Sequence, residues 1–338
     1  MHLLVLASGS GGHVYPCLSF IKYALQSHKV SYLKIKDGFE NKIPDKIYES
    51  AIIDVPNQLK TYLKHPKSFF KLKKELNIII PKLDDIDAII CFGGFVSFIG
   101  VLLSIKMHKP LYLHEQNIII GDANRVAAFF AKKVFLSFNL KTNNSKFKYV
   151  GNPRMDECLL SSPISTSTYN VLFFAGSLAS SSLNDIVEKV LQKKFSEKIN
   201  LTIISGDKFY QNLKKYETRN IHIIAYQKDM ISLMKKMDLI IMRAGATSLS
   251  ELIALEKVGI VIPSPNVKHH HQEKNAKYLA NRNAIIMIKE SDLTPERLFD
   301  EINDMSSDYF RQLTIKNNIR KFQKKEVCKT MLKEIEDA

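Results

Sequence analysis

Cysteine is scarce in this chain of 338 residues. The four cysteines, Cys17, Cys91, Cys158 and Cys328, are far apart and form no Cys-x-x-Cys pair. This spacing indicates reduced thiols, which are typical of proteins that stay in the cytosol. The first residues also lack the cationic start and the longer apolar stretch of a secretory signal peptide. We therefore expect a cytosolic protein without disulfide bonds.

Long apolar stretches are nearly absent as well. The exception, residues 88–105, carries no charge and is long enough for a helix across a thin bilayer. However, Gly93-Gly94 interrupts it, and residues 88–92 before this pair have the length and apolar character of a buried strand. We therefore expect a strand, a tight turn and a core helix here instead of a membrane span.

Acidic residues are outnumbered, because 34 Asp and Glu stand against 49 Lys and Arg, which gives a net charge of +15 at pH 7. Such a surplus attracts polyanions, acidic membrane surfaces or phosphorylated substrates, but it indicates no particular fold. The hydrophobic fraction of 45% and the charged fraction of 25% are those of a soluble globular protein. At this length the chain can form two domains, each with its own core.

Short apolar runs alternate with amphipathic stretches of helix length along the chain, as is typical of parallel sheets covered by helices. The predicted strands form two series, residues 3–7, 30–33, 51–55, 88–92, 111–113 and 134–138, then 171–175, 201–204, 221–224, 239–242, 260–262 and 285–288. The Ser- and Thr-rich residues 161–168 separate the series like a linker. We predict two similar α/β domains, 1–160 and 161–338, with a cleft between them and a C-terminal helix able to pack back on the first.

The first predicted strand runs directly into the glycine-rich stretch Ser8-Gly9-Ser10-Gly11-Gly12-His13. Pro16, a few residues further on, suits the first turn of a helix. A junction of strand, glycine-rich turn and helix commonly holds anionic ligands, because glycines let the backbone approach a phosphate and the helix amides point at it. His13 adds an ionisable group where a substrate would lie.

The other polar clusters also follow predicted strands. They are Gly93-Gly94-Phe95, His114-Glu115-Gln116-Asn117, Gly151-Asn152-Pro153-Arg154, Gly176-Ser177, residues 243–251, and Gln272 with Asn275. Ligands of parallel α/β sheets bind beyond the carboxyl ends of the strands, so these clusters are expected at the mouth of one cleft.

In this order and spacing the clusters resemble the MurG family of glycosyltransferases, from residue 3 to about residue 290. Members of that family move N-acetylglucosamine from UDP-N-acetylglucosamine (UDP-GlcNAc) to lipid I and so make lipid II of peptidoglycan. The resemblance implies a GT-B fold, two Rossmann-like domains with the acceptor on the N-terminal one and the donor on the C-terminal one. It also implies an inverting displacement, no cofactor, and a place at the cytoplasmic face of the cell membrane.

The resemblance further implies roles for single residues. His13 is the expected general base, because histidine titrates near neutrality and can take the proton of the acceptor hydroxyl. Glu251 is expected to hold the ribose hydroxyls, and the amides of Ala246, Thr247 and Ser248 to face the diphosphate from a helix start. The other expected substrate contacts are Ser10, Gly11, Gly12, Asn117, Arg154, Ser177, Gln227 and Gln272.

Three positions depart from the family pattern. Ser8 and Ala179 stand where glycine is usual, which bears on how closely a phosphate can approach the two loops. Phe95 stands where tyrosine is common, so a hydroxyl that would touch the acceptor is missing.

Two motifs suggest a metal, but neither predicts a site. His269-His270-His271 are adjacent, so their rings cannot easily converge on one ion, and no matching group of cysteines or histidines lies near them in the sequence. Asp85-Ile86-Asp87 has the D-x-D form of metal-dependent glycosyltransferases, yet it precedes its predicted strand and so falls on the side of the sheet away from ligands. We expect transfer to need no metal.

Residues 59–74 contain six lysines interleaved with leucine, tyrosine and phenylalanine, and no acid. An ordinary amphipathic helix with a solvated lysine face would have this pattern. A membrane-surface patch would have it too, with apolar groups at the acyl boundary and lysines on anionic headgroups. We favour the membrane surface, because the implied acceptor is a lipid and the first domain is expected to bind it.

Other functions remain open at this point. Within the same fold, a glycolipid glycosyltransferase or a UDP-sugar epimerase would have a similar donor domain. The charge of +15 suggests a nucleic-acid-binding protein, but it is spread along the chain and no such motif occurs, so no nucleic-acid partner is expected. A dinucleotide dehydrogenase is disfavoured, because residues 30–34 offer no acid for the ribose at the end of the second strand.

Overall fold

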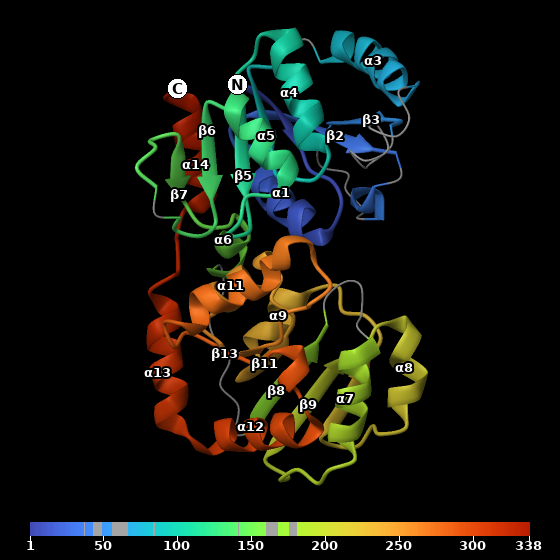
Figure 1. The fold of residues 1–338 in the computed structure, drawn as a ribbon, viewed down its shortest axis with the longest axis vertical. Helices are drawn as coiled ribbons and strands as arrows, with labels where there is room; N and C mark the ends of the chain where they lie inside the picture. Colours follow the sequence, from blue (N-terminus) through green and yellow to red (C-terminus); the bar gives the residue numbers. More distant parts are fainter. Residues whose placement is uncertain are drawn as a thin grey trace. The chain divides into compact units, whose positions relative to one another are not determined.

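The chain divides into two compact units (Figure 1). A computed structural model describes residues 1–36, 38–42, 49–55, 67–83, 85–140, 142–159, 168–175 and 181–338. The first unit consists of residues 1–157 with residues 324–338, and the second of residues 158–323. The expected linker 161–168 lies outside the described residues except for Thr168, and so does the expected boundary at 160/161.

The first unit is built on a parallel sheet with strand order β3-β2-β1-β4-β5-β6-β7. Its strands are β1 (His2–Leu6), β2 (Lys29–Ile35), β3 (Glu49–Ile53), β4 (Ala88–Cys91), β5 (Leu111–Glu115), β6 (Lys133–Leu136) and β7 (Phe147–Tyr149). The order reverses between β1 and β4, which pair directly through the register Leu4 to Ile89. Such a reversal is where ligands of doubly wound sheets bind.

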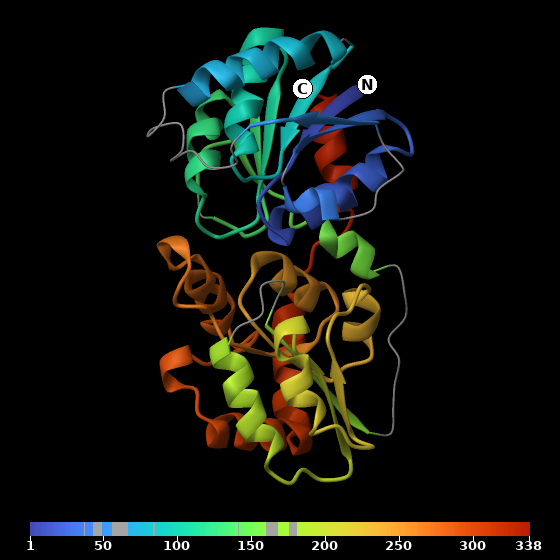
Figure 2. The ribbon, with the colours of Figure 1, turned by 90° about the vertical axis from the view of Figure 1, so that its right-hand side faces the viewer.

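Helices bury both faces of this sheet, which explains why its central strands are apolar throughout. The helices are α1 (Gly11–Ala24), α3 (Lys67–Ile79), α4 (Val96–Met107), α5 (Asp122–Phe130), α6 (Arg154–Leu159) and α14 (Val327–Glu336). Leu4 and Leu6 share a core with α3, α4 and α5. Figure 2 shows these helices on one side of the sheet and α1 with α14 on the other.

The C-terminal helix α14 is attached to the first unit by a carboxylate. Asp156 accepts hydrogen bonds from the amides of Val327 and Cys328, at 3.0 and 2.8 Å. These are first-turn amides that have no partner within their own helix, so an acidic side chain stabilises the helix start. On the helix's buried side, the hydroxyl of Tyr112 donates to the carbonyl of Ile335.

The second unit repeats the plan with the strand order β10-β9-β8-β11-β12-β13, again parallel. Its strands are β8 (Tyr169–Phe174), β9 (Ile199–Ile204), β10 (Ile221–Ile224), β11 (Leu239–Met242), β12 (Val258–Val261) and β13 (Ile286–Met287). Its helices are α7 (Ser181–Leu191), α8 (Asp207–Lys214), α9 (Met230–Lys235), α10 (Ala246–Ala254), α11 (His271–Ala280), α12 (Pro295–Ser307) and α13 (Tyr309–Arg320). Here the order reverses between β8 and β11.

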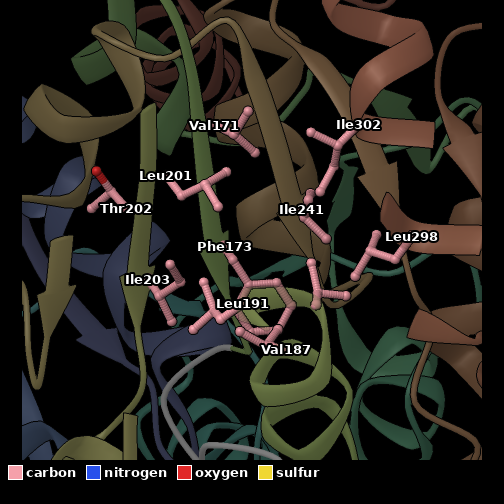
Figure 3. A pocket seen from close by; sticks show the side chains of 11 residues that line it. Val171, Phe173, Val187, Leu191, Leu201, Thr202, Ile203, Ile241, Leu298 and Ile302 are labelled. Atoms are coloured by element: carbon pink, nitrogen blue, oxygen red, sulfur yellow. The ribbon is translucent and has the colours of Figure 1, made fainter. Parts of the chain in front are cut away.

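An apolar cavity of about 20 Å³ lies inside the second unit. Figure 3 shows Val171 and Phe173 of β8, Val187 of α7 and Leu298 of α12 among the side chains around it. It has room for about one water molecule but offers almost no polar partner, so it is a packing gap. It lies in the core, away from the strand ends where a ligand would bind.

The uncharged residues 88–105 form the predicted strand, turn and core helix. Strand β4 ends at Cys91, Gly93 and Gly94 form the turn, and α4 begins at Val96. No helix of the described residues is long and apolar enough to cross a membrane. The four cysteines are free, as their spacing predicted, and all four are buried.

Strand β7 was not predicted from the sequence. Its three residues Phe147, Lys148 and Tyr149 alternate apolar and charged side chains and are only half-buried at the sheet edge. A run this short has too little apolar character to be recognised, and it becomes a strand because β6 pairs with it.

Candidate active site

The loop after β1 and the turn after β4 meet at the strand reversal of the first sheet. Gly93 and Gly94 have φ angles of +101° and +84°, a backbone region that glycine adopts without strain. A Cβ atom on Gly94 would lie 2.3 Å from the carbonyl oxygen of Ser8, and one on Gly93 would lie 2.6 Å from Nδ1 of His13. The two glycines are therefore needed to let the β4 turn pack against Ser8 and His13.

Helix α1 begins at this meeting point with Gly11, Gly12 and His13. Ser10 precedes it in extended conformation, and its side chain makes no capping hydrogen bond. The first amides of a helix carry a partial positive charge and point out of its start. The expected contacts Ser10, Gly11 and Gly12 thus lie at an anion-attracting helix start, with His13 one turn into the helix.

The imidazole of His13 is held by Gln116, the residue that directly follows strand β5. Its Nδ1 lies 2.8 Å from Oε1 of Gln116. The amide nitrogen of Gln116 donates to the carbonyl of Phe92 at 2.8 Å and lies 3.0 Å from Nδ1 of His114. On its other side, Nε2 of His114 lies 3.0 Å from the carbonyl oxygen of Gly151. The motif His114-Glu115-Gln116-Asn117 therefore contacts the glycine-rich stretch that follows β1.

His114 is fully buried, and this burial lowers its pKa from 6.5 to about 4. The hydrogen bond to the Gly151 carbonyl favours the charged form, and the nearby His13 disfavours it, but burial is the largest cause. The ring of His114 is therefore neutral at neutral pH.

Glu115 holds the loop that follows β5. Its carboxylate accepts from the amides of Asn117 and Gly121, both at 2.9 Å, and from the side-chain amide of Asn124 at 3.0 Å. The side-chain amide of Asn117 lies 3.3 Å from the same carboxylate. Glu115 was not among the predicted site residues, although a buried acid within a polar motif was a signal for such a role.

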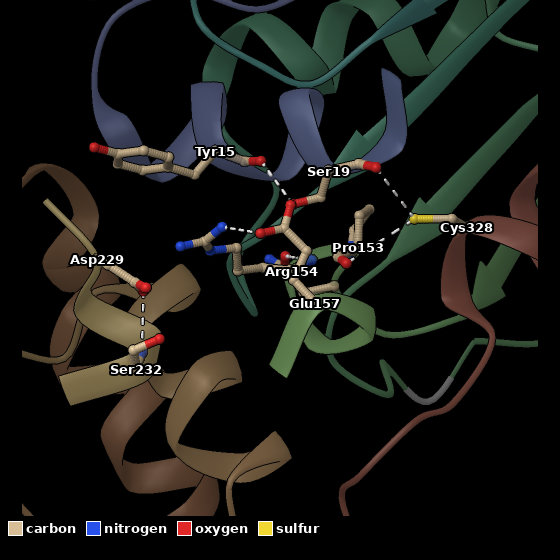
Figure 4. A network of polar contacts seen from close by, with 9 residues as sticks. Tyr15, Ser19, Pro153, Arg154, Glu157, Asp229, Ser232 and Cys328 are labelled. Carbon is tan, nitrogen blue, oxygen red and sulfur yellow. Dashed lines mark hydrogen bonds and ion pairs between the residues drawn. The ribbon is translucent and has the colours of Figure 1, made fainter. Parts of the chain in front are cut away.

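Arg154 begins α6 and lies beside α1 within the first unit. Its guanidinium forms an ion pair with Glu157 and lies over the ring of Tyr15 at 5.3 Å (Figure 4). In the same view the thiol of Cys328 lies near the carbonyl oxygens of Ser19 and Pro153. The expected contact of Arg154 with the nucleotide stays a prediction.

In the second unit, the strand reversal places the start of α10 directly after β11. Gly245 precedes the helix and provides no side-chain cap. The carbonyl of Gly245 accepts a hydrogen bond from the amide of Leu249 at 2.9 Å. Ala246, Thr247 and Glu251 are buried in this helix. A helix start of this kind at a strand reversal suits a diphosphate.

Gln272 and Gln227 make hydrogen bonds in two separate loops of the second unit. Oε1 of Gln272 accepts from the amide of Ser264 at 2.9 Å, which leaves its amide nitrogen without a partner among the described residues. Gln227 donates to the carbonyl of Asp229 at 3.0 Å, and Asp229 caps α9 by accepting from the amide of Ser232 (Figure 4). Ser177, the remaining expected contact, lies outside the described residues.

Comparison with known proteins gives one family match for each half of the chain. Residues 3–136 match the glycosyltransferase family 28 N-terminal domain, and residues 170–331 match the family 28 C-terminal domain. The chain belongs to glycosyltransferase family 28. Its expected membership of the MurG family is confirmed by the curated relatives.

Two curated relatives are each named a UDP-N-acetylglucosamine–N-acetylmuramyl-(pentapeptide) pyrophosphoryl-undecaprenol N-acetylglucosamine transferase. The relative from Pediococcus pentosaceus is 32% identical over 94% of both chains, and that from Psychromonas ingrahamii is 33% identical over 88% of this chain and 87% of its own. The crystal structure of Acinetobacter baumannii MurG has a TM-score of 0.80 with 24% identity, covering 100% of this chain and 99% of that one. The predicted GT-B class, two Rossmann-like units with parallel sheets, is confirmed.

Arg243, the first residue of the polar cluster 243–251, makes contacts in this family 28 glycosyltransferase that the sequence did not predict. Arg243, at the end of β11, is 8% exposed and forms an ion pair with Glu290, while its guanidinium also donates to the carbonyl of Ile262. Ser182 donates to the same Glu290 carboxylate at 2.6 Å. These contacts connect the start of α7 with the residues that directly follow β11 and β12.

The two motifs that suggest a metal in the sequence make hydrogen bonds to backbone groups in this glycosyltransferase. Asp87 precedes β4, and its carboxylate accepts from the amide of His2 at 2.7 Å. Nδ1 of His271 lies 2.8 Å from the carbonyl of Lys268. Within the part of the chain that the structure describes, no three His, Cys, Asp or Glu side chains gather as metal ligands would.

Proposed function

We propose that this glycosyltransferase transfers N-acetylglucosamine from UDP-GlcNAc to the 4-hydroxyl of the N-acetylmuramic acid of lipid I, which gives lipid II. The names of the curated relatives, which align over nearly the full length of both chains, support this choice of donor and acceptor. The observation that carries it is the pairing of His13 with the buried Gln116 at the strand reversal of the first unit. A site that holds an imidazole in one orientation suits the removal of a proton.

The proposed reaction is a single displacement. Nε2 of His13 takes the proton of the acceptor hydroxyl as its oxygen bonds to the anomeric carbon of N-acetylglucosamine. The bond between that carbon and the β-phosphate oxygen breaks, and its electron pair leaves with UDP. Attack opposite to the leaving group inverts the anomeric centre and produces a β linkage. The start of α10 would stabilise the negative charge that develops on the diphosphate.

A direct assay tests this proposal. The protein is incubated with radiolabelled UDP-GlcNAc and a lipid I analogue, and the expected product is a labelled disaccharide lipid. Parallel reactions with diacylglycerol as acceptor, and with UDP-GlcNAc alone, test the glycolipid glycosyltransferase and the epimerase. Label in the diacylglycerol product, or conversion of the sugar nucleotide itself, would replace the proposed function.

We propose that Glu251 binds the ribose diol of the donor. The amide nitrogen of Gln272, which has no partner among the described residues, is available to a sugar hydroxyl. Glu251 is 6% exposed in the second turn of α10, one turn from the helix start proposed for the diphosphate. A buried carboxylate can accept both hydrogens of a vicinal diol.

Replacing Glu251 by alanine is expected to weaken UDP binding by roughly 2–4 kcal/mol, because two charge-assisted hydrogen bonds are lost. Glu251→Gln, which keeps the size of the side chain, should lose part of this. Glu296→Ala removes an exposed carboxylate of the same unit and serves as the matched control. Calorimetry with UDP measures all three, and unchanged affinity in Glu251→Ala would exclude the assignment.

We also propose that the first unit attaches the enzyme peripherally to the cytoplasmic face of an anionic membrane. Residues 59–66 of the lysine-rich stretch lie outside the described residues, whereas Lys67 to Lys74 form the start of α3. On this helix Phe70 is 75% exposed, and Lys73 and Lys74 are exposed beside it, while Leu72 is buried in the core. An exposed aromatic ring among lysines supports binding to anionic headgroups.

Co-sedimentation with anionic vesicles should be salt-sensitive and should decrease when Phe70 becomes serine and Lys67, Lys73 and Lys74 become glutamine. Phe310→Ser is the matched control, because Phe310 is an equally exposed phenylalanine of α13 in the second unit. Duplex DNA in place of vesicles tests the nucleic-acid alternative. Equal sedimentation of the α3 variant and the parent protein would contradict the membrane proposal.

A further inference from the structure

Gln116 is buried between two histidines and a backbone carbonyl, and its neighbours determine which way its amide points. Its nitrogen lies 2.8 Å from the carbonyl oxygen of Phe92 and 3.2 Å from that of His114. Both are acceptors only, so the group that faces them must be the donating NH₂. The reversed orientation would bring the amide oxygen against two carbonyl oxygens and leave it unsatisfied in a buried site.

This orientation decides the protonation of both imidazoles. Oε1 of Gln116 faces Nδ1 of His13 and can only accept, so Nδ1 carries the hydrogen. On the other side Nε2 of His114 faces the Gly151 carbonyl and must also carry its hydrogen, which leaves Nδ1 of His114 to accept from Gln116. The hydrogen bonds thus all run in one direction, from His13 to Gln116, from Gln116 to His114, and from His114 to Gly151.

We infer that Gln116 is a positioning residue that holds His13 in the Nδ1–H tautomer, so that Nε2 is free to accept the proton of the acceptor hydroxyl. The inference rests on the proposed function for its catalytic consequence, but the tautomer follows from the geometry alone. A neutral histidine in water favours the opposite tautomer, in which Nε2 already carries a hydrogen. Without Gln116, the major form of His13 would have no lone pair on Nε2.

Two features keep this arrangement in place at neutral pH. Burial holds His114 neutral, and a neutral ring keeps the Nδ1 lone pair that accepts from Gln116. In a protonated His114, Nδ1 would carry a hydrogen and face the donating amide nitrogen of Gln116. The hydrogen bond between the two residues would then be lost. The nearby His13 also disfavours the charged form of His114. The ring of His13 is also confined sterically, because it packs directly against Gly93.

Nuclear magnetic resonance tests the tautomer without any need for turnover. Protein labelled with ¹⁵N-histidine is examined by long-range ¹H–¹⁵N correlation, and the His13 signals are assigned from their loss in His13→Gln. We expect the Nδ1–H pattern in the parent protein, and a mixed or Nε2–H pattern in Gln116→Met. An Nε2–H pattern in the parent, or an unchanged pattern in Gln116→Met, would overturn the inference even if transfer to lipid I is observed.

Kinetics test the consequence. Gln116→Met should lower kcat by about 10- to 100-fold, as outer residues that orient a histidine commonly do, with a smaller change in KM for UDP-GlcNAc. Gln116→Glu places a carboxylate beside Nδ1 and should move the acid limb of the pH profile to higher pH. Gln323→Met, which removes a donated hydrogen bond to the carbonyl of Ala254 in the second unit, is the control and should keep the parent kcat.

A double mutant separates positioning from a structural role. If Gln116 acts through His13, then Gln116→Met should cost no further activity in a His13→Ala background. A full additional loss in that background, or an unmoved acid limb in Gln116→Glu, would mean that Gln116 only supports the fold. If the parent protein transfers no sugar at all, the proposed function fails while the resonance experiment still decides the tautomer.

Discussion

Turnover of the His13→Ala variant is expected to fall by roughly 100- to 10,000-fold, the range that a general base contributes. Its affinity for UDP should stay that of the parent, because Glu251 and the start of α10, which are proposed for the ribose and the diphosphate, belong to the second unit. Product formation measures the first quantity and calorimetry with UDP the second. The two variants His13→Ala and Glu251→Ala should therefore separate chemistry from donor binding.

This separation makes the assignment of His13 refutable. Loss of UDP affinity in His13→Ala as large as that in Glu251→Ala would make His13 a binding or structural residue. A turnover close to that of the parent would exclude it as the base. Hydrogen exchange of β1 and α1 serves as the control for folding, because His13 packs against the Gly93 turn and its loss could loosen that turn.

The first unit should lose roughly 3 kcal/mol of unfolding free energy between pH 7 and pH 4 because of His114 alone. Its imidazole titrates near 6.5 when exposed in the unfolded chain and near 4 in the folded protein. Between these values the unfolded state binds more protons, so stability is full above the higher pKa and falls as the pH is lowered towards the folded one. The size of the effect follows from the buried position of the ring, which has 0% exposure.

Comparison of two pH profiles isolates this contribution. Urea unfolding is followed by hydrogen exchange of β5, which reports on the first unit alone, in the parent and in His114→Gln. The variant is less stable at neutral pH because it loses contacts, but its profile should be flatter between pH 7 and pH 4. His222→Gln, which replaces an exposed histidine of β10, is the control. Parallel profiles for the parent and His114→Gln would contradict the prediction.

Local sequence was sufficient to predict most strands and to indicate a candidate site in each unit. The strands β10 and β11 occur at the predicted residues, and β1 and β4 within one residue of them, because a strand buried on both faces must be a short apolar run. The loops after such strands carry the ligand in this architecture, so His13 and the start of α10 could be identified as candidates. The edge strand β7 lacks that signal and was missed.

The roles of the residues within each cluster could not be predicted in the same way. His13 and Gln116 are separated by 103 positions, and only the pairing of β1 with β4 and of β4 with β5 brings them together. The same holds for Asp156, which caps a helix that begins 171 positions later. Hydrogen bonds depend on distances of about 3 Å, which the order of residues along the chain does not contain.

The sequence by itself determined the class of this protein. Apolar runs and glycine-rich turns indicated two parallel α/β domains, because these features are local and repeat at each strand end. The resemblance of the co-linear polar motifs to a known family implied a glycosyltransferase. The tertiary structure alone decided which motif residues act on each other. It placed Gln116 between His13 and His114 and buried both its neighbour Glu115 and the ring of His114. Burial and hydrogen-bond direction arise only when strands distant in sequence pack side by side, and these two properties govern the protonation of the proposed base.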